Sequence, residues 1–230
     1  MYKTLLGPMG FKKENTLLLT DQTDRKPTLR NIKWALATRK DDTVVIFFAG
    51  LGSVEADPRA VARDGRSRYL VAADTDPLDL YSTALPMDEL QTLLQRYEAE
   101  RVVVFLDASY SGAAGGRTVP MMKRNPTGFP TGFETMPSSR ARAFVTSCRP
   151  NEISLEAADL GHGIFTYYLV EGLRGAADLN HDGIVTMLEL YEYVEQQVSR
   201  RSRTMGGNQH PVLNGDLAGV GTLPLSKTRP

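Results

Sequence analysis

The 230-residue sequence carries one cysteine, three histidines and no excess of either charge. The single cysteine, Cys148, excludes an internal disulfide and leaves the redox compartment undetermined. The 27 Lys and Arg residues balance 27 Asp and Glu residues without a basic block, so a nucleic-acid or membrane-surface partner has no electrostatic support. No stretch approaches the roughly 18 apolar residues of a membrane span, and the N-terminal residues lack a signal-peptide core. We therefore expect a soluble, cytoplasmic protein.

Strand-like and helix-like segments alternate along the chain. With 41% hydrophobic residues, a chain of this length can bury one core, and we expect a single domain over residues 1–230. The pattern predicts strands at Asn15–Thr20, Thr43–Ala49, Tyr69–Val71, Arg101–Leu106 and Arg142–Thr146, and a charged loop at Asp57–Arg68. It predicts helices at Thr28–Thr38, Pro86–Tyr97, Ile164–Leu173 and Met187–Val198. This alternation favours an α/β fold, with a mostly parallel central sheet flanked by helices.

Two apolar runs end in glycine and small polar residues. The first is Thr43–Gly52, TVVIFFAGLG, and the second is Arg101–Gly112, RVVVFLDASYSG. Short runs rich in Val, Ile and Phe are typical of strands that are buried on both faces. In open α/β folds such strands carry ligand-binding and catalytic groups at their carboxyl ends, so we expect a functional site where these two runs end.

The two strand ends resemble those of the caspase-like cysteine peptidases, a family that includes caspases, metacaspases and the bacterial orthocaspases. In that family the first strand ends in S-G-H-G and the second in D-A-C-x-S-G or a close variant. Here Leu51 stands at the histidine position and Ser109 at the cysteine position, 58 positions apart (109 − 51), close to the about 50 typical of caspases. The resemblance implies a caspase-like three-layer sandwich in which both catalytic residues are substituted.

Loss of both residues argues against the family's reaction. Leucine can neither accept nor donate a proton, and the Ser109 hydroxyl is a weak nucleophile unless a base removes its proton. Of the three histidines, His162 and His210 lie in segments whose family counterparts have no proton-transfer role, and His181 lies in a predicted metal loop. We interpret Cys148 as a small buried apolar residue rather than a displaced nucleophile.

We therefore hypothesise a catalytically inactive caspase-like domain of the metacaspase or orthocaspase type. It would act as a binding, scaffolding or regulatory module. One alternative is an endopeptidase that cleaves after Arg or Lys and is inactivated here by substitution. The other is a hydrolase that depends on Ser109 and an unrecognised base.

Asp107 is the candidate substrate-binding residue. In the family members that cleave after Arg or Lys, an Asp two residues before the catalytic cysteine pairs with the basic side chain of the substrate, and Asp107 matches it. Ala49 argues against this role, because relatives often carry serine there. The alternative is a strand-end carboxylate bonded to nearby backbone amides. The expected partners are peptide or protein segments with basic residues, an active caspase-like relative or a second copy of the chain.

The segment Asp178–Glu189, DLNHDGIVTMLE, matches the pattern of an EF-hand calcium loop. Short oxygen-bearing side chains at alternate positions converge on one cation, and Gly183 permits the tight turn. The predicted Ca²⁺ ligands are Asp178, Asn180, Asp182, the Ile184 carbonyl, Thr186 and Glu189. The alternative is a loop that is kept only as a structural turn.

The resemblance divides the chain into a large-part-like region at 1–112, a linker at 113–140 and a small-part-like region at 141–230. The linker is rich in Gly, Pro, Thr and Ser, and it is either a processing segment, with Lys123, Arg124 and Arg140 as cleavage points, or a surface loop. The N-terminal residues resemble the end of a helix that follows the family's first strand. Either the given sequence starts after that strand, or the sheet lacks it. A sheet without it would have an open edge or core face.

Overall fold

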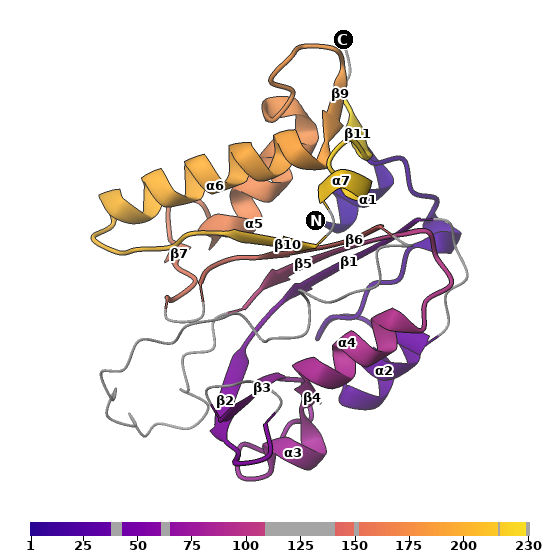
Figure 1. Cartoon of the computed structure of the whole chain (residues 1–230), viewed down its shortest axis with the longest axis vertical. Coiled ribbons are helices and arrows are strands. Elements are labelled where there is room, and N and C mark those ends of the chain that lie inside the picture. Colours follow the sequence, from indigo (N-terminus) through magenta and orange to yellow (C-terminus); the bar gives the residue numbers. More distant parts are fainter. Residues whose placement is uncertain (38–42, 61–64, 109–140, 150–151, 216, 229–230) are drawn as a thin grey trace.

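The central sheet has four strands in the order β1-β5-β6-β10 (Figure 1). The computed structural model describes residues 1–37, 43–60, 65–108, 141–149, 152–215 and 217–228. The sheet strands are β1 (Thr43–Ala49), β5 (Arg101–Asp107), β6 (Ala141–Thr146) and β10 (Val212–Gly215). β1, β5 and β6 are parallel and β10 is antiparallel, so the predicted mostly parallel sheet is confirmed.

Helices cover both faces of this sheet, as the alternation of strands and helices predicts (Figure 1). The helices α2 (Leu29–Ala37) and α4 (Met87–Gln95) lie on one side, and α5 (Ile164–Glu171) and α6 (Met187–Thr204) on the other. Val103 and Phe105 pack on the α5–α6 side, whereas Val104 packs with Leu90 of α4 on the opposite side. Because successive side chains of a strand point to opposite faces, a continuous run of Val and Phe in β5 serves both layers.

A small antiparallel sheet follows β1. It consists of β2 (Gly52–Ala56), β3 (Arg66–Leu70) and β4 (Leu85–Pro86), with α3 (Leu80–Thr83) beside β4 in sequence. The predicted loop at Asp57–Arg68 is therefore too long, because β3 begins at Arg66. The strand predicted at Tyr69–Val71 is confirmed but starts earlier. Arg66 is exposed and Ser67 half-buried, whereas Arg68, Tyr69 and Leu70 are buried. The polar first half of β3 hides the start of the strand in a charged segment.

The remaining elements are short and lie mainly around α5 and α6. They are α1 (Tyr2–Leu6), the 3₁₀ turn η1 (Lys13–Asn15), β7 (Glu156–Ala157), β8 (His162–Gly163), the π-helical turn η3 (Gly172–Ala176), β9 (Ile184–Thr186), α7 (Leu217–Val220) and β11 (Pro224–Lys227). β9 pairs with β11, and β7 pairs with β8. The helix predicted at Met187–Val198 is confirmed and continues to Thr204.

The strand predicted at Asn15–Thr20 is wrong. Lys13–Asn15 forms a 3₁₀ turn, and residues 16–20 adopt no regular structure. The apolar side chains that suggested a strand, Leu17 and Leu18, remain 38% and 40% exposed. The Thr20 N–H donates locally to the Thr23 hydroxyl. An apolar run is not sufficient for a strand when its polar backbone groups find partners within the same turn.

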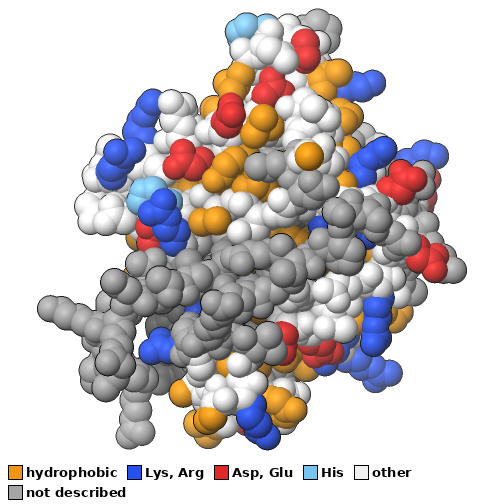
Figure 2. Space-filling view, viewed as in Figure 1, with side chains coloured by type: hydrophobic (Ala, Val, Ile, Leu, Met, Phe, Trp, Pro, Cys, Tyr) orange, Lys and Arg blue, Asp and Glu red, His pale blue; other side chains and the backbone are white. Residues whose placement is uncertain are grey.

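Within the described ranges, β1 is the first strand of the central sheet in chain order and pairs with β5 alone. In the same part of the chain, no helix has both the length and the apolar character that crossing a bilayer requires. Basic and acidic side chains are interspersed over the described part of the face that Figure 2 shows, without a block of one sign.

Candidate functional site

The two strand ends that the sequence singles out lie side by side. In the parallel register of β1 and β5, Ala49 is opposite Asp107, and the Gly50 N–H donates to the Asp107 carbonyl at 3.1 Å. The carboxyl ends of parallel strands meet at one edge of a sheet, which is why segments far apart in sequence converge here. The expectation that both runs end at one place is therefore met by the fold.

Leu51 directly follows the end of β1. Its side chain is 65% exposed, while its carbonyl oxygen accepts a hydrogen bond from Val71 N–H at 2.9 Å. The backbone is thus held between β1 and β2, and an apolar side chain stands where the resemblance places a histidine. The second substituted position, Ser109, lies outside the described residues, as does the predicted linker at 113–140.

The Asp107 carboxylate is nearly buried, with the residue 8% exposed. Its Oδ1 accepts the Ser154 hydroxyl at 2.7 Å, and its Oδ2 accepts the Thr166 hydroxyl. Among the described residues the hydrogen-bond donors to this side chain are these two hydroxyl groups. The alternative of backbone amide donors stays a prediction, because residues 109–112 lie outside the described residues. Sequence reasoning missed both partners, because isolated Ser and Thr residues give no signal of what they contact.

The carboxylate also lies at the start of α5. Gly163 is the N-cap of this helix, and a Cβ atom there would lie 2.9 Å from Asp107 Oδ2. Thr166 belongs to the first turn of the same helix. The partial positive charge of the helix N-terminus therefore lies beside the carboxylate. The missing side chain at Gly163 is what lets the carboxylate approach the helix so closely.

No Lys, Arg or His within the described ranges forms an ion pair with Asp107. A nearly buried carboxylate with hydroxyl donors but no cation keeps acceptor capacity, because each of its oxygens can take a second hydrogen bond. A guanidinium or ammonium group is the chemical complement of such a site.

Gln209 contacts Ser154 and is fully buried. Its Oε1 accepts Leu155 N–H at 2.8 Å, and its Nε2 donates to the Ser147 carbonyl at 2.9 Å and to Ser154 Oγ at 3.3 Å. Gln209 thereby ties the segment before β10 to the loop that follows β6. No pattern in the sequence distinguishes Gln209 from a surface glutamine.

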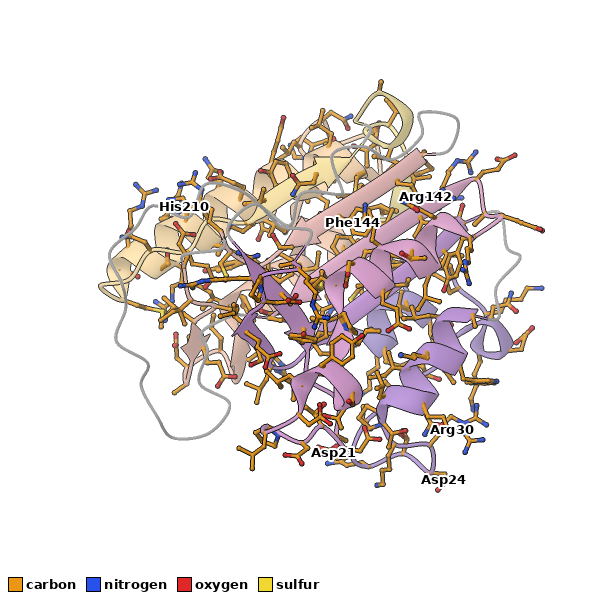
Figure 3. All side chains as sticks on the ribbon, turned by 60° about the horizontal axis from the view of Figure 1, so that its bottom comes forward. Asp21, Asp24, Arg30, Arg142, Phe144 and His210 are labelled. Atoms are coloured by element: carbon orange, nitrogen blue, oxygen red, sulfur yellow. The ribbon has the colours of Figure 1, made fainter. Side chains whose placement is uncertain are left out.

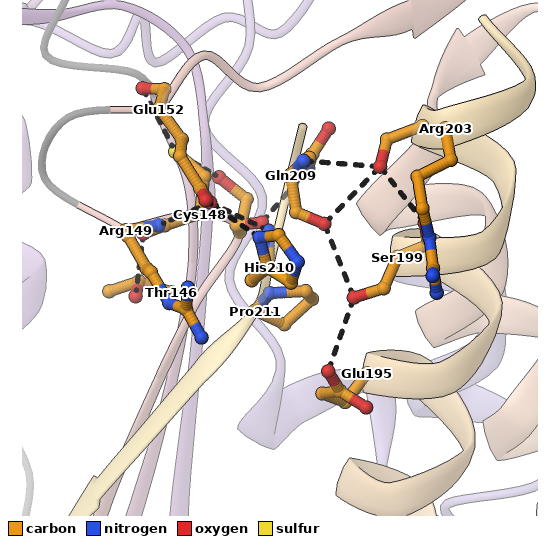
Figure 4. Close-up of polar contacts among 12 residues, drawn as sticks. Thr146, Cys148, Arg149, Glu152, Glu195, Ser199, Arg203, Gln209, His210 and Pro211 are labelled. Atoms are coloured by element: carbon orange, nitrogen blue, oxygen red, sulfur yellow. Dashed lines mark hydrogen bonds and ion pairs between the residues drawn. The ribbon is translucent and has the colours of Figure 1, made fainter. Parts of the chain in front are cut away.

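The neighbouring residue, His210, is bound by Glu152 (Figure 4). His210 Nδ1 lies 2.6 Å from Glu152 Oε1, while Glu152 Oε2 accepts His210 N–H at 2.7 Å and Arg149 N–H at 3.2 Å. Burial alone would raise the pKa of Glu152. The hydrogen bonds from His210 and Arg149 outweigh burial and hold this pKa below its usual value. The carboxylate therefore fastens the loop after β6 to His210.

Cys148 is buried, as the sequence predicts. Burial raises the pKa of its thiol to about 12, so the thiol is protonated at neutral pH and is a poor nucleophile. Its Sγ lies 3.6 Å from the Glu152 carbonyl oxygen. Of the other histidines, His162 belongs to the short strand β8, and His181 lies in the predicted calcium loop with a φ of 60°.

The loop Asp178–Glu189 is held together by its own polar groups. Asp178 Oδ1 accepts Asp182 N–H at 3.1 Å, and its Oδ2 accepts Gly183 N–H at 3.1 Å. Asn180 Oδ1 accepts the same Asp182 N–H at 2.9 Å. Gly183 has a φ of 85°, the left-handed conformation that the tight turn requires. The predicted ligands at the first, third and fifth positions are thus brought together.

The end of this loop is engaged differently. Glu189 Oε2 accepts the Thr186 N–H at 3.0 Å and the Thr186 hydroxyl at 2.7 Å, which completes a capping box at the start of α6. Ile184 and Thr186 belong to β9, which pairs with β11. The described residues contain no group of three or more His, Cys, Asp and Glu side chains arranged to hold a metal ion. Glu189 would have to leave the capping box to bind a cation, and calcium binding stays a prediction.

Comparisons with known proteins give structural likeness without sequence relatives. No protein-family profile matches the chain, and no curated protein matches it. Protein GSU0716 from Geobacter sulfurreducens has a similar structure, with a TM-score of 0.56 at 20% identity over 88% of this chain and 80% of that one. Caspase-1 from Spodoptera frugiperda is similar with a TM-score of 0.50 at 17% identity, over 92% of this chain and 74% of that one.

Likeness at this level of identity establishes the fold and leaves the activity open. The likeness to caspase-1 agrees with the parallel strands β1, β5 and β6 and with helices on both faces of the sheet. The chain therefore has a caspase-like α/β fold.

Proposed function

We propose that this chain is a catalytically inactive caspase-like domain that binds protein segments with basic side chains through Asp107. The proposal rests on one juxtaposition. A nearly buried carboxylate, held by two hydroxyl donors, lies beside a strand end where the exposed Leu51 occupies the place of the family's base. Recognition of a basic group needs only the first of these features, whereas cleavage needs a proton acceptor that Leu51 lacks.

The absence of a base at position 51 favours binding over hydrolysis. Peptide cleavage by a thiol or hydroxyl requires a base to remove the proton of the nucleophile and an acid to protonate the leaving amine. A leucine side chain supports neither step. The alternative of a Ser109-dependent hydrolase differs from the proposal because it predicts turnover by the unmodified chain. The alternative of an Arg- or Lys-specific endopeptidase inactivated by substitution predicts turnover only once the catalytic residues are restored. We also propose that the domain is of the metacaspase or orthocaspase type, that it pairs with an active relative, and that calcium stabilises it.

Asp107 supports recognition of a guanidinium in particular. Arginine offers N–H donors in a planar fork, and a carboxylate that is fixed by other donors presents its remaining lone pairs in a defined direction. Hydrogen bonds to charged groups contribute about 1.5–3 kcal/mol. Since about 1.4 kcal/mol is a factor of ten, removing the charge of Asp107 is expected to weaken binding about ten- to a hundredfold.

A pair of isosteric ligands tests this proposal. Binding of N-acetyl-arginine amide and of its neutral isostere N-acetyl-citrulline amide is measured by NMR titration with the unmodified chain, with Asp107→Asn and with Asp21→Asn. Asp21 is exposed and serves as a control with the same change of charge. The arginine ligand is expected to bind at least about tenfold more tightly than the citrulline ligand, and only Asp107→Asn is expected to abolish the preference. Equal binding of the two ligands by the unmodified chain would contradict the proposal.

A further inference from the structure

The amide orientation of Gln209 is fixed by its neighbours. Leu155 N–H can only donate, so the atom that faces it at 2.8 Å is the carbonyl oxygen Oε1. Nε2 therefore faces the other way, where the Ser147 carbonyl oxygen lies at 2.9 Å and Ser154 Oγ at 3.3 Å. Both hydrogens of the amide nitrogen are then in use, and the residue is fully buried.

This orientation decides where the Ser154 hydroxyl points its hydrogen. Ser154 Oγ has one hydrogen to donate, and Gln209 Nε2 occupies an acceptor position on the oxygen. The hydrogen is left for Asp107 Oδ1 at 2.7 Å. A hydrogen-bond chain thus runs from the Ser147 carbonyl through Gln209 and Ser154 to the carboxylate.

We propose that Gln209 is a positioning residue that directs the Ser154 hydroxyl onto Asp107 and thereby sets the affinity of Asp107 for a guanidinium or ammonium group. This inference rests on the proposed function. Its physical basis is preorganisation: a carboxylate held in one orientation by fixed donors loses less freedom when a cation binds. Thr166 holds the second oxygen independently, because its hydroxyl comes from α5.

A purely structural role for Gln209 makes a different prediction. Its backbone N–H donates to Ser202 Oγ at 3.1 Å, and its carbonyl accepts from Ser199 and Ser202 at 3.4 Å each, which fastens the segment to α6 (Figure 4). If packing on α6 were its only contribution, loss of the side-chain amide would affect ligand binding equally with or without the Ser154 hydroxyl.

A double-mutant cycle separates these roles. The affinity for N-acetyl-arginine amide is measured for the unmodified chain, Gln209→Met, Ser154→Ala and the double variant. Gln209→Met keeps the side-chain length but removes the amide, and the matched control is Gln196→Met on the exposed face of α6. Each single variant is expected to lose about tenfold in affinity, and the double variant no more than Ser154→Ala alone. The losses in affinity from Thr166→Val and Gln209→Met are expected to multiply when the two are combined, because Thr166 acts on the other oxygen of Asp107.

The outcomes also separate this inference from the proposed function. If the unmodified chain does not bind the arginine ligand, or binds it without Asp107, both are overturned. If Asp107→Asn abolishes binding but Gln209→Met has no effect, or has its full effect in the Ser154→Ala background, only the role of Gln209 is overturned. Thermal unfolding identifies variants that do not fold. Should Gln209→Met be one of them, Gln209→Asn replaces it, because that variant retains the amide but retracts it by one methylene.

Discussion

Asp107 and Leu51 occupy neighbouring strand ends but meet opposite environments. The carboxylate is nearly buried and bonded to two hydroxyls, whereas the leucine side chain is 65% exposed. An exposed apolar side chain contributes little to stability, so the leucine at this position is not required by packing. The side chain at the position where the resemblance places a histidine thus lies outside the core, while the Asp107 carboxylate is held by two hydroxyl donors.

Glu152 predicts a dependence of stability on pH. Because the folded state lowers the pKa of Glu152 from its ordinary 4.5, the ionised carboxylate stabilises the folded state above that value. This contribution is lost as the pH falls through the lowered pKa. We expect the difference in free energy of unfolding between the unmodified chain and Glu152→Gln to be constant near neutral pH and to shrink below about pH 4.5.

The measurement is urea unfolding at a series of pH values, with Glu192→Gln on the exposed face of α6 as the matched control. A difference that stays constant down to pH 3 would show that the bonds from His210 and Arg149 to Glu152 do not favour its ionised form.

The sequence predicts the burial of some individual residues and not of others. Cys148 could be recognised as buried because its own segment is strand-like. Ser154, Thr166 and Gln209 could not, since their partners lie 47, 59 and 55 positions away in sequence. Ser, Thr and Gln are also ordinary surface residues, so nothing in their local sequence distinguishes a buried donor from a solvated one.

Among the elements, β6 carries a buried arginine near its start, and we expect this side chain to stabilise the folded state. Arg142 is 4% exposed, and its guanidinium donates to the carbonyl oxygens of Tyr97, Ala99 and Glu100, between α4 and β5 (Figure 3). Arg142→Met keeps the apolar stem but removes these donors. We expect a loss of about 3 kcal/mol in the free energy of unfolding, measured in urea. Arg30→Met, at an exposed position on α2, is expected to change stability by less than about 0.5 kcal/mol. Equal losses in the two variants would contradict this role.

The loop before α6 predicts a response to calcium. Asp178, Asn180 and Asp182 are already drawn together by hydrogen bonds, and Glu189 would leave its capping box to bind a cation. We expect 1 mM Ca²⁺ to raise the melting temperature of the unmodified chain, and EDTA to reverse the shift (about 1 mM is the weak end of such loops). Asp178→Ala is expected to abolish the shift, and Asp24→Ala, at an exposed position, to leave it intact.

Comparing the shift within each variant removes the effect of lost hydrogen bonds on basal stability. A melting temperature that does not respond to calcium, together with a calorimetric titration without heat, would leave the loop as a structural turn that pairs with β11 through β9.

The sheet strands that could be predicted are those with apolar runs, because their apolar character marks them without knowledge of their neighbours. The expectation that the two runs are buried on both faces holds for β5 but is wrong for β1, which lies at the edge of the described sheet and is mostly half-buried. β6 is largely buried although it contains Arg142. β2 and β10 were missed, because a strand that is covered on one face or lies at an edge depends on its partner for definition. The same dependence explains the wrong strand at Asn15–Thr20, whose Leu17 and Leu18 find no buried face.

For the molecule as a whole, the fold and the reaction are separable. The two core layers on either side of β5 are built from apolar residues that do not include Leu51. A substitution at position 51 is therefore expected to leave the three-layer arrangement intact, and the caspase-like fold is shared with caspase-1 at only 17% identity. The fold by itself therefore does not determine whether the chain catalyses a reaction.

The most direct test of the central claim is turnover of fluorogenic peptides with Arg or Lys before the scissile bond. It is measured with and without calcium for the unmodified chain, Ser109→Cys and the double variant Leu51→His/Ser109→Cys. We predict no release of fluorophore by the unmodified chain or by Ser109→Cys, because neither has a base at position 51, and measurable release by the double variant. Cleavage by the unmodified chain after Arg or Lys would contradict the claim that this domain binds without hydrolysing.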